Sequence, residues 1–264
     1  MTTPDWVLVT GAAQRLGRET ALAFARAGWN VLCHYRGSHA AALQTQADVA
    51  AAGRQCALVQ ADLAQAGAAS ALLDQCAQQA GALPRCIVNN ASIFEADDAG
   101  TASAAHLQAH FQTNTATPLL LGNALHARLR AQGGAAPGRH SVIHVLDQKV
   151  HNLNPDYFSY TVSKLALERC VQLQAQALAP LVRVCGLSPG LMYLSGPQTQ
   201  ENFARASRVN LLGQAIDPQD VAQCALFMAG NTCLNGCTLQ ADNGQHLVPL
   251  ARDVMFAIDD NARP

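Results

Sequence analysis

The sequence predicts an α/β fold in which a doubly wound parallel sheet of about seven strands carries helices on both faces. Short, almost continuously apolar runs recur along the chain, and longer stretches rich in Ala, Leu and Gln separate them. Strands covered on both faces read as continuous apolar runs, and helical segments between them are typical of parallel sheets. A length of 264 residues, about half of them apolar, suits a single domain over residues 1–264.

Seven segments have strand character, at residues 6–10 (WVLVT), 30–35 (NVLCHY), 56–61 (CALVQA), 86–91 (CIVNNA), 141–146 (SVIHVL), 182–188 (VRVCGLS) and 238–242 (TLQAD). Gly28 and Gly53 end two of the intervening helices, because a left-handed residue there turns the chain back toward the sheet. The stretch from Leu191 to Gly213 is the longest without strand character. We expect it to form a lid over a ligand at the carboxyl ends of the strands.

Composition and charge exclude several classes of partner. A formal net charge of -1 provides no basic field for nucleic acid or anionic lipid. No apolar stretch approaches the roughly 20 residues that cross a bilayer, and MTTPDWVLVTG at the N-terminus lacks the regions of a signal peptide. His144 and His151 have no supporting Cys or His cluster, so no metal site is expected. We therefore expect a cytoplasmic protein that binds a small molecule, with no nucleic-acid or membrane partner.

The stretch TGAAQRLG, residues 10–17, predicts a phosphate-binding turn. Gly11 follows the first strand and Gly17 lies at the start of a helix. Backbone N–H groups and the positive end of the helix dipole would then face a pyrophosphate. Glycine-rich turns also occur without a ligand, so this loop by itself leaves the dinucleotide site open.

The end of the second strand, CHYRGSH, favours NADPH over NADH. An NAD site normally carries an acidic residue here for the ribose hydroxyl, and none occurs between Glu19 and Asp48. Arg36 lies in this region with His34, Tyr35 and Ser38 beside it. A guanidinium binds a 2′-phosphate well, because it can donate two parallel hydrogen bonds.

The stretch YTVSKLALERC places Tyr160 and Lys164 on one face of a helix expected to begin near Asp156. An ammonium near a phenol stabilises the phenolate. We therefore expect Lys164 to lower the pKa of Tyr160 toward a range useful for proton transfer. NNAS after the fourth strand and Asn114 in NTATP accompany this pair.

Together these motifs make the chain resemble the short-chain dehydrogenase/reductase family, whose members have a Rossmann-type fold, from end to end. The resemblance rests on Thr10, Gly11, Gly17, Asp62, NNA at 89–91, Asn114, Tyr160, Lys164 and Pro189-Gly190. It implies that Asp62 contacts the adenine, that Lys164 holds the nicotinamide ribose and that Asn114 supports a proton relay. It also implies a homotetramer built partly on helices that include Leu107 to Leu129 and Tyr157 to Leu178. The cofactor-binding residues expected from the motifs and the resemblance are Gly11, Arg15, Leu16, Gly17, His34, Tyr35, Arg36, Ser38, Asp62, Leu63, Asn89, Asn90, Ala91, Tyr160, Lys164, Pro189 and Gly190.

Two positions depart from the usual family pattern. Arg15 replaces the middle glycine of the turn, and Asp147 lies thirteen residues before Tyr160, where a catalytic serine is common. Both departures occur in the pteridine reductase subgroup, which the chain also resembles in TGAAQRLG, HYRGS and NNASIF. That resemblance implies that Phe94 stacks on a pterin and that Ser92 bonds its polar edge. It also implies that Arg15 reaches the carbonyl side of the ring.

The expected reaction is hydride transfer from NADPH to a C=N bond of a dihydropterin. The substrate-binding set is Arg15, Ser92, Phe94, Asp147 and Tyr160, and the catalytic set is Asp147, Tyr160, Lys164 and Asn114. A buried carboxyl keeps its proton to higher pH than an exposed one, and an ionised carboxylate would repel the alkoxide that forms from a ketone.

Several alternatives stay open at the level of sequence. The chain could be a carbonyl reductase of the same fold, in which Asp147 has no explanation, or a non-catalytic NADP-binding protein. Asp147 could be a structural cap, Phe94 a core aromatic, and Arg15 a phosphate ligand alone.

Overall fold

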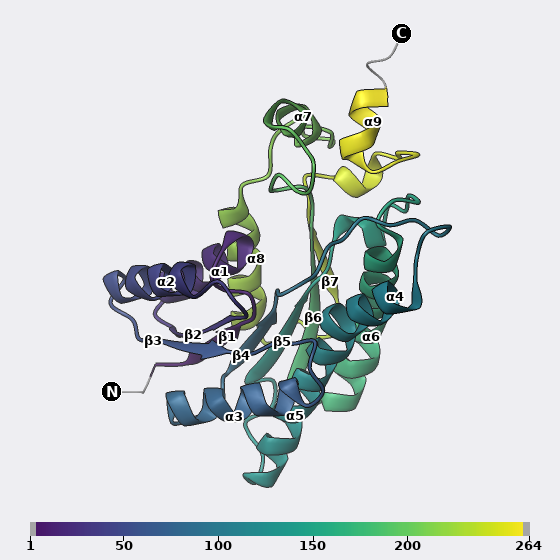
Figure 1. Ribbon diagram of the computed structural model, residues 1–264. Helices are drawn as coiled ribbons and strands as arrows, with labels where there is room; N and C mark the ends of the chain where they lie inside the picture. Colours follow the sequence, from purple (N-terminus) through teal and green to yellow (C-terminus); the bar gives the residue numbers. More distant parts are fainter. Residues whose placement is uncertain (1–3, 261–264) are drawn as a thin grey trace.

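The computed structural model describes residues 4–260, and within them the strands form one seven-stranded sheet in which every pair is parallel. The strands are β1 (Trp6–Val9), β2 (Asn30–Tyr35), β3 (Cys56–Gln60), β4 (Cys86–Asn89), β5 (His140–Val145), β6 (Val182–Pro189) and β7 (Thr238–Ala241). Their order is β3-β2-β1-β4-β5-β6-β7, so the winding reverses between β1 and β4 (Figure 1). The predicted fold is confirmed, because all seven expected strands are present.

Helices cover both faces of this sheet (Figure 1). One face carries α1 (Arg15–Arg26), α2 (His39–Ala51) and α8 (Pro218–Gly230), and the other carries α3 (Ala68–Ala80), α5 (Thr117–Ala131) and α6 (Phe158–Leu178). A short α4 (Ala104–Phe111) continues through a π-helical turn (Gln112–Ala116) into α5. The first long helix expected by resemblance is therefore interrupted by a π turn. The second begins at Phe158, slightly after Asp156.

Strand side chains alternate between two hydrophobic cores. Val7 and Val9 belong to the core beneath α1 and α8, whereas Leu8 between them belongs to the core beneath α3 and α5. On β5, Ile143 and Val142 are divided between the two cores in the same way. Both sets are buried, and this explains why the strands read as continuous apolar runs.

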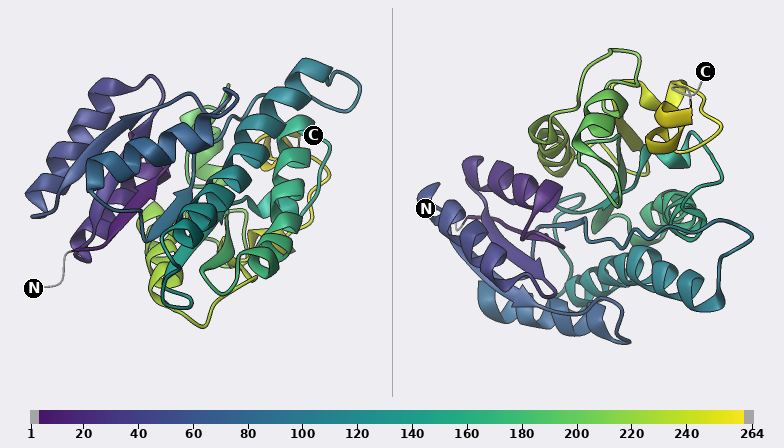
Figure 2. Two further views of the ribbon diagram at one scale, coloured as in Figure 1. Left: turned by 90° about the horizontal axis from the view of Figure 1, so that it is seen from below. Right: turned by 45° about the horizontal axis from the view of Figure 1, so that its top comes forward.

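The segments beyond the carboxyl ends of β6 and β7 pack against each other. The Leu191 to Gly213 stretch contains α7 (Gln200–Ala206), and α9 (Val254–Asp260) follows β7. Asn202 Nδ2 donates a hydrogen bond to the Met255 carbonyl oxygen at 2.8 Å. Figures 1 and 2 show α7 and α9 together at one end of the molecule. None of the helices in the described part of the chain has the length and apolarity needed to cross a membrane.

Candidate active site

Two cavities lie next to each other at the carboxyl ends of the strands. The larger, of about 460 Å³, is bounded by the 11–17 turn, the end of β2 and the segments after β3 and β4. The smaller, of about 240 Å³, is bounded by α6 and by the segments after β5, β6 and β7. The two cavities share the lining residues Arg15, Leu16, Asn90, Ser92 and Tyr193. Ligands in the two cavities would therefore meet at this shared wall.

Gly17 is required by close packing at the start of α1. A Cβ atom at this position would lie 2.1 Å from the Gly11 carbonyl oxygen and 2.6 Å from Asn90 Nδ2. Gly11 itself has a φ of +67°, which an L side chain rarely adopts. Asn90 Nδ2 also donates to the Thr10 carbonyl oxygen at 2.9 Å, and this bond ties the turn to the end of β4. The predicted turn is therefore present and tightly packed.

His34 holds this turn from beneath. The Gly11 backbone N–H donates to His34 Nδ1 at 3.0 Å, and His34 Nε2 lies 3.1 Å from the Ala61 carbonyl oxygen. Burial lowers the pKa of His34 to about 4, so the ring is neutral and its Nε2–H donates to Ala61. His34 lines the cavity, as expected. Both of its nitrogens are already used by the backbone, however, so its contribution to the cavity is to fix the turn.

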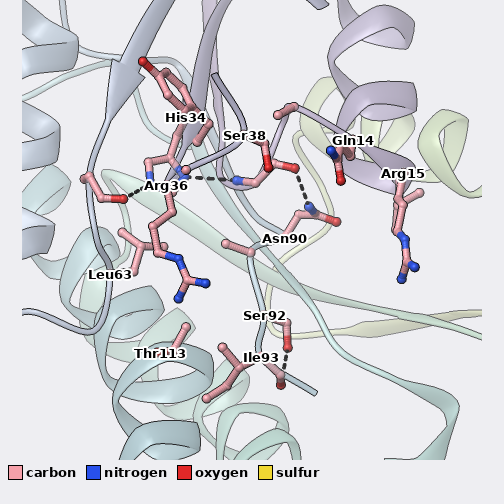
Figure 3. Close-up of a pocket in the computed structure, with 18 of the residues that line it drawn as sticks. Gln14, Arg15, His34, Arg36, Ser38, Leu63, Asn90, Ser92, Ile93 and Thr113 are labelled. Atoms are coloured by element: carbon pink, nitrogen blue, oxygen red, sulfur yellow. Dashed lines mark hydrogen bonds between the residues drawn. The ribbon is translucent and has the colours of Figure 1, made fainter. Parts of the chain in front are cut away.

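The larger cavity fits a phosphorylated dinucleotide. Within residues 4–260, no side chain caps the N-terminus of α1, and the first turn of α1 contains no acidic residue. Its dipole is thus available to an anion. Arg36 and Arg15 both line the cavity, and Figure 3 shows them on opposite sides of it. The Arg36 side chain is exposed, and it makes no hydrogen bond to any other described residue. The expected residues Tyr35, Ser38, Asp62, Leu63 and Ala91 line the same cavity.

Arg15 lies at the boundary between the two cavities. Its φ of +51° is in the left-handed region that favours glycine. Its Nη2 donates to the Leu194 carbonyl oxygen at 3.2 Å, and its guanidinium carbon lies 5.8 Å from the centre of the Tyr193 ring. Arg15 therefore connects the phosphate turn to the Leu191 to Gly213 stretch.

Asn89 was expected among the cofactor-binding residues. It lines neither cavity, so that expectation was wrong. Its Nδ2 donates to the Pro118 carbonyl oxygen at 3.3 Å and lies 3.2 Å from His144 Nδ1. Side chains alternate along β4, so Asn89 faces α5 on the same side as Ile87. Asn90, one residue later, reaches both cavities.

Asp147 and Tyr160 form a hydrogen-bonded pair in the smaller cavity. Tyr160 Oη donates to Asp147 Oδ2 at 2.8 Å, and the Lys149 backbone N–H donates to Asp147 Oδ1 at 2.9 Å. Lys164 Nζ donates to the Val145 carbonyl oxygen at 2.7 Å and lies 5.7 Å from the centre of the Tyr160 ring. The side chains of Asp147, Tyr160 and Lys164 therefore meet at one wall, as their sequence spacing predicts.

Burial shifts the pKa values of these three groups. It raises the pKa of Tyr160 well above its ordinary value of 10.0, and the Asp147 carboxylate raises it further. The expectation that Lys164 lowers this pKa was therefore wrong, because desolvation and the neighbouring carboxylate act in the opposite direction. Burial also raises the pKa of Asp147, and it lowers the pKa of Lys164 to about 8.

Asn114 supports the cavity wall from behind. Its Oδ1 accepts from the Ile93 backbone N–H at 2.9 Å and from Ser92 Oγ at 3.1 Å. Its Nδ2 donates to the Ile93 carbonyl oxygen and to Ser163 Oγ, both at 3.0 Å. These bonds engage the amide with the 92–93 segment and α6. Asn114 lines neither cavity, so any support that it gives to a proton relay, as the resemblance implies, would act through the residues that it holds.

The Phe94 ring packs against two tyrosine rings, those of Tyr157 and Tyr160. Its ring centre lies 4.0 Å from that of Tyr157, with the planes 20° apart, and 4.7 Å from that of Tyr160, with the planes nearly perpendicular. Phe94 lines the smaller cavity, so its place is compatible with an aromatic ligand.

Sequence reasoning missed the charged pair of Lys149 and Asp253 in the smaller cavity. Lys149 Nζ donates to Asp253 Oδ2 at 2.8 Å and to Asn154 Oδ1 at 2.7 Å, and the lysine side chain is only 3% exposed. The only feature of the sequence that could have pointed to Lys149 as a site residue is its place two residues after Asp147. Asp253 has no local signal, because it comes from the distant segment before α9. Tyr193 was missed as well, although it lines both cavities.

The two histidines considered for a metal have other neighbours. His144 Nε2 lies 2.9 Å from Gln174 Oε1, while the other ring nitrogen faces Asn89. His151 packs near His246, with ring centres 5.8 Å apart. Over residues 4–260, no group of three or more His, Cys, Asp or Glu side chains is arranged to hold a metal ion.

Comparison with known proteins gives matches over nearly the whole chain. A family model described as enoyl-(acyl carrier protein) reductase matches residues 11–246. Dihydromonapterin reductase of Escherichia coli (strain K12) is 29% identical over 246 residues, which are 93% of this chain and 98% of that protein.

Solved structures of NADP-bound reductases are also similar to this chain. FolM alternative dihydrofolate reductase 1 from Brucella canis, complexed with NADP, has a TM-score of 0.84 and 32% identity, covering 92% of this chain and 94% of that chain. The angucycline C-6 ketoreductase LanV with bound NADP has a TM-score of 0.81 at 23% identity, covering 92% and 96% of the two chains. This last likeness shows the fold alone.

Proposed function

The chain belongs to the short-chain dehydrogenase/reductase family, and from that premise we propose that this NADPH-dependent oxidoreductase reduces a C=N bond of a dihydropterin. The reductases named for dihydromonapterin and dihydrofolate, to which the chain is similar at about 30% identity, support a pterin substrate.

The observation that carries the proposal is the carboxyl of Asp147 beside Tyr160. Reduction of a ketone needs a neutral hydroxyl that stabilises the developing alkoxide, and an ionised carboxylate would repel that charge. Reduction of a C=N bond needs a proton for the ring nitrogen. In the structure the Asp147 carboxylate accepts a hydrogen bond from Tyr160. Burial raises the pKa of Asp147, so this carboxylate takes up a proton more readily than an exposed one and can pass it to the ring nitrogen.

The chain's own residues would hold the cofactor in the larger cavity. The N-terminus of α1 would bind the pyrophosphate, and Arg36 the 2′-phosphate. Lys164 and Tyr160 line the smaller cavity beside Pro189 and Gly190, and the nicotinamide would lie next to them. When bound there, NADPH supplies the hydride.

Phe94, Ser92 and Arg15 would orient the substrate. Phe94 provides an aromatic surface for a flat ring, and Ser92 and Arg15 provide polar groups at the wall shared by the two cavities. Tyr160 Oη and Asp147 Oδ2 share the proton that the ring nitrogen receives. The raised pKa values keep this proton on the pair until the nitrogen becomes basic.

A homotetramer and a substrate lid complete the proposal. Leu107, Phe111 and Val162 are exposed apolar side chains around a cavity of about 290 Å³ between α4 and α6, and a second copy could cover them. Light scattering at several protein concentrations measures the mass of the assembly and so tests the homotetramer.

The proposed lid is the Leu191 to Gly213 stretch, which includes α7.

Steady-state oxidation of NADPH tests the reaction directly. We expect turnover with dihydropterins such as dihydromonapterin or dihydrobiopterin, and weak or no turnover with simple ketones. Turnover of ketones without turnover of any dihydropterin would reject the proposal. Asp147→Ser should reduce dihydropterin turnover by about a hundredfold, because it removes the proton-donating carboxyl. The carbonyl-reductase alternative requires that variant to keep or improve ketone turnover.

A further inference from the structure

Gln148 contributes to the wall of the smaller cavity a side-chain amide whose oxygen has no hydrogen-bond donor among residues 4–260. Its side chain lines that cavity beside Asp147 and Lys149, yet it is only 8% exposed. Its Oε1 is completely buried and accepts no hydrogen bond from any residue in the described part of the chain. Leaving a buried amide oxygen without a donor destabilises the protein, so such groups are rare in folded proteins.

The backbone around Gln148 is fixed by a tight turn. Asp147 caps the short 3-10 helix Gln148–Val150 through its bond from the Lys149 N–H. The Gln148 carbonyl oxygen accepts from the backbone N–H groups of His151 at 2.9 Å and Asn152 at 3.1 Å. The Gln148 side chain is therefore attached to the same turn that positions Asp147.

Neighbouring polar groups are already paired. Lys149 Nζ binds Asp253 and Asn154, and Asp147 accepts from Tyr160 and from the Lys149 N–H. Lys164 Nζ donates to Val145. Each of these charged groups therefore already has a hydrogen-bond partner in the protein, whereas the Gln148 amide oxygen, a neutral acceptor, has none among residues 4–260.

We propose that Gln148 is a substrate-recognition residue, whose carboxamide pairs with the amide-like edge of the pterin ring. This inference rests on the proposed function, and it assigns recognition of the amide-like ring edge to the cavity wall that contains Gln148. A carboxamide offers one acceptor and two donor hydrogens, which complement a neutral ring edge carrying an N–H or amino group beside a carbonyl or ring nitrogen. Because Oε1 has almost no accessible surface in the structure, the carboxamide must turn about its last bond to face the ring. A simple ketone has no such donor, so it would leave Oε1 unpaired.

A substrate that satisfies Gln148 is favoured over one that does not. A site built to hydrogen-bond a polar group discriminates strongly against ligands that lack the group, because its own buried atom is then left unpaired. Gln148 would therefore distinguish substrates by the polar edge of their ring and not by the kind of bond that is reduced.

Gln148→Met tests this role, because methionine has a similar length and cannot hydrogen-bond the ring. We expect the KM for a dihydropterin to rise about tenfold while kcat falls less than about threefold. The KM for NADPH should change less than about twofold. On the enzyme saturated with NADP, the Kd of pterin should rise about tenfold. The Kd of unsubstituted pteridine, which has neither the amino nor the oxo group, should stay the same.

Thr161→Val is the matched control. Thr161 also has a buried side-chain oxygen that finds no hydrogen-bond partner within residues 4–260, but it lines neither cavity. This near-isosteric exchange should leave both KM values unchanged. Gln148→Leu provides a second apolar variant in case methionine disturbs folding, and thermal unfolding checks both.

The outcomes separate the inference from the proposed function. If the unsubstituted enzyme turns over no dihydropterin, the proposed function fails and the inference with it. If the unsubstituted enzyme is active and Gln148→Met has the same KM, only the inference is overturned. An equal loss of affinity for pterin and pteridine would also overturn it, since that pattern indicates packing rather than hydrogen bonding.

Discussion

Arg15 is the residue at which local strain and site chemistry meet. Its left-handed backbone costs about 1 kcal/mol that glycine would not pay. In return, the guanidinium reaches the Leu194 carbonyl and the wall shared by the two cavities. The arginine at a glycine position is thus compatible with the turn, and its side chain lies where both ligands would be in reach.

Lys164 shows a second local cost at the same site. Its ammonium is 3% exposed, and burial lowers its pKa from 10.5 to about 8. At pH 7 the lysine is therefore protonated in the folded state at a cost in stability. That cost is fully present below pH 8 and disappears as the pH rises to 10.5, where both folded and unfolded chains are neutral at this position.

Lys164→Met should accordingly abolish turnover and raise the stability. We expect the free energy of unfolding at pH 7 to increase by up to about 3 kcal/mol, less what is lost when the Val145 carbonyl loses its donor. The advantage over the unsubstituted protein should shrink between pH 8 and 10.5. Urea unfolding at a series of pH values measures this. A difference that does not vary with pH would contradict the buried-charge explanation.

At the scale of elements, the β1 to α1 connection depends on how closely the helix approaches the turn. The start of α1 touches Gly11 and Asn90, so the turn, the helix and the end of β4 form one packed unit. This unit places the N-terminus of α1 at the larger cavity. A substitution that changes the packing between α1 and the turn should therefore change the affinity for the cofactor.

Gly17→Ala should disrupt this unit. The added methyl group would lie 2.1 Å from the Gly11 carbonyl oxygen, so the helix must move away. We expect a loss of about 2 kcal/mol in stability, and a KM for NADPH raised at least about tenfold. The measurements are thermal unfolding and steady-state kinetics.

Gly230→Ala is the control at the last residue of α8. A Cβ atom there meets no other atom within 4 Å. The alanine should leave the KM for NADPH unchanged and alter stability by less than about 1 kcal/mol. Equal effects of the two substitutions would show that close packing at Gly17 is not the cause.

At the scale of the whole molecule, two ionic contacts join the segment before α9 to the catalytic region. Arg252 binds both carboxylate oxygens of Asp156 at 2.8 to 3.0 Å, and Asp253 binds Lys149. Asp253 and Val254 also line the smaller cavity. The C-terminal segment therefore forms part of the site, although it lies about a hundred residues from Lys149 in sequence.

Asp253→Asn should test the buried pair. Asparagine still caps α9, where Asp253 accepts from the Met255 N–H, but it removes the opposite charge that Lys149 Nζ contacts directly. We expect a loss of about 3 kcal/mol in stability and a higher KM for the dihydropterin. Chemical unfolding and steady-state kinetics measure the two effects.

Lys149→Met combined with Asp253→Asn is the control for that variant. It removes both charges, so most of the lost stability should return. A double variant no more stable than Asp253→Asn alone would show that the unpaired charge is not responsible.

Several features of the site could be read from the sequence because their determinants are local. The glycine turn and the spacing of Tyr160 and Lys164 each depend on a few consecutive residues. The relative placement of Asp147 and Tyr160 also followed, because β5 and α6 are neighbours in the chain. The role of Asn89 did not follow, since a single residue decides which face of β4 a side chain occupies.

The sequence by itself determined the sheet, through apolar runs that only two-sided burial explains, and it placed Asp147, Tyr160 and Lys164 at one end of that sheet. Only the tertiary structure decided the pKa of Tyr160, because burial and the distance to a carboxylate set its direction. It also brought Asp253 to Lys149, and it left Gln148 Oε1 without a hydrogen-bond donor in the described part of the chain. Such facts depend on which distant segments exclude water from a group, and no short stretch of residues contains that information.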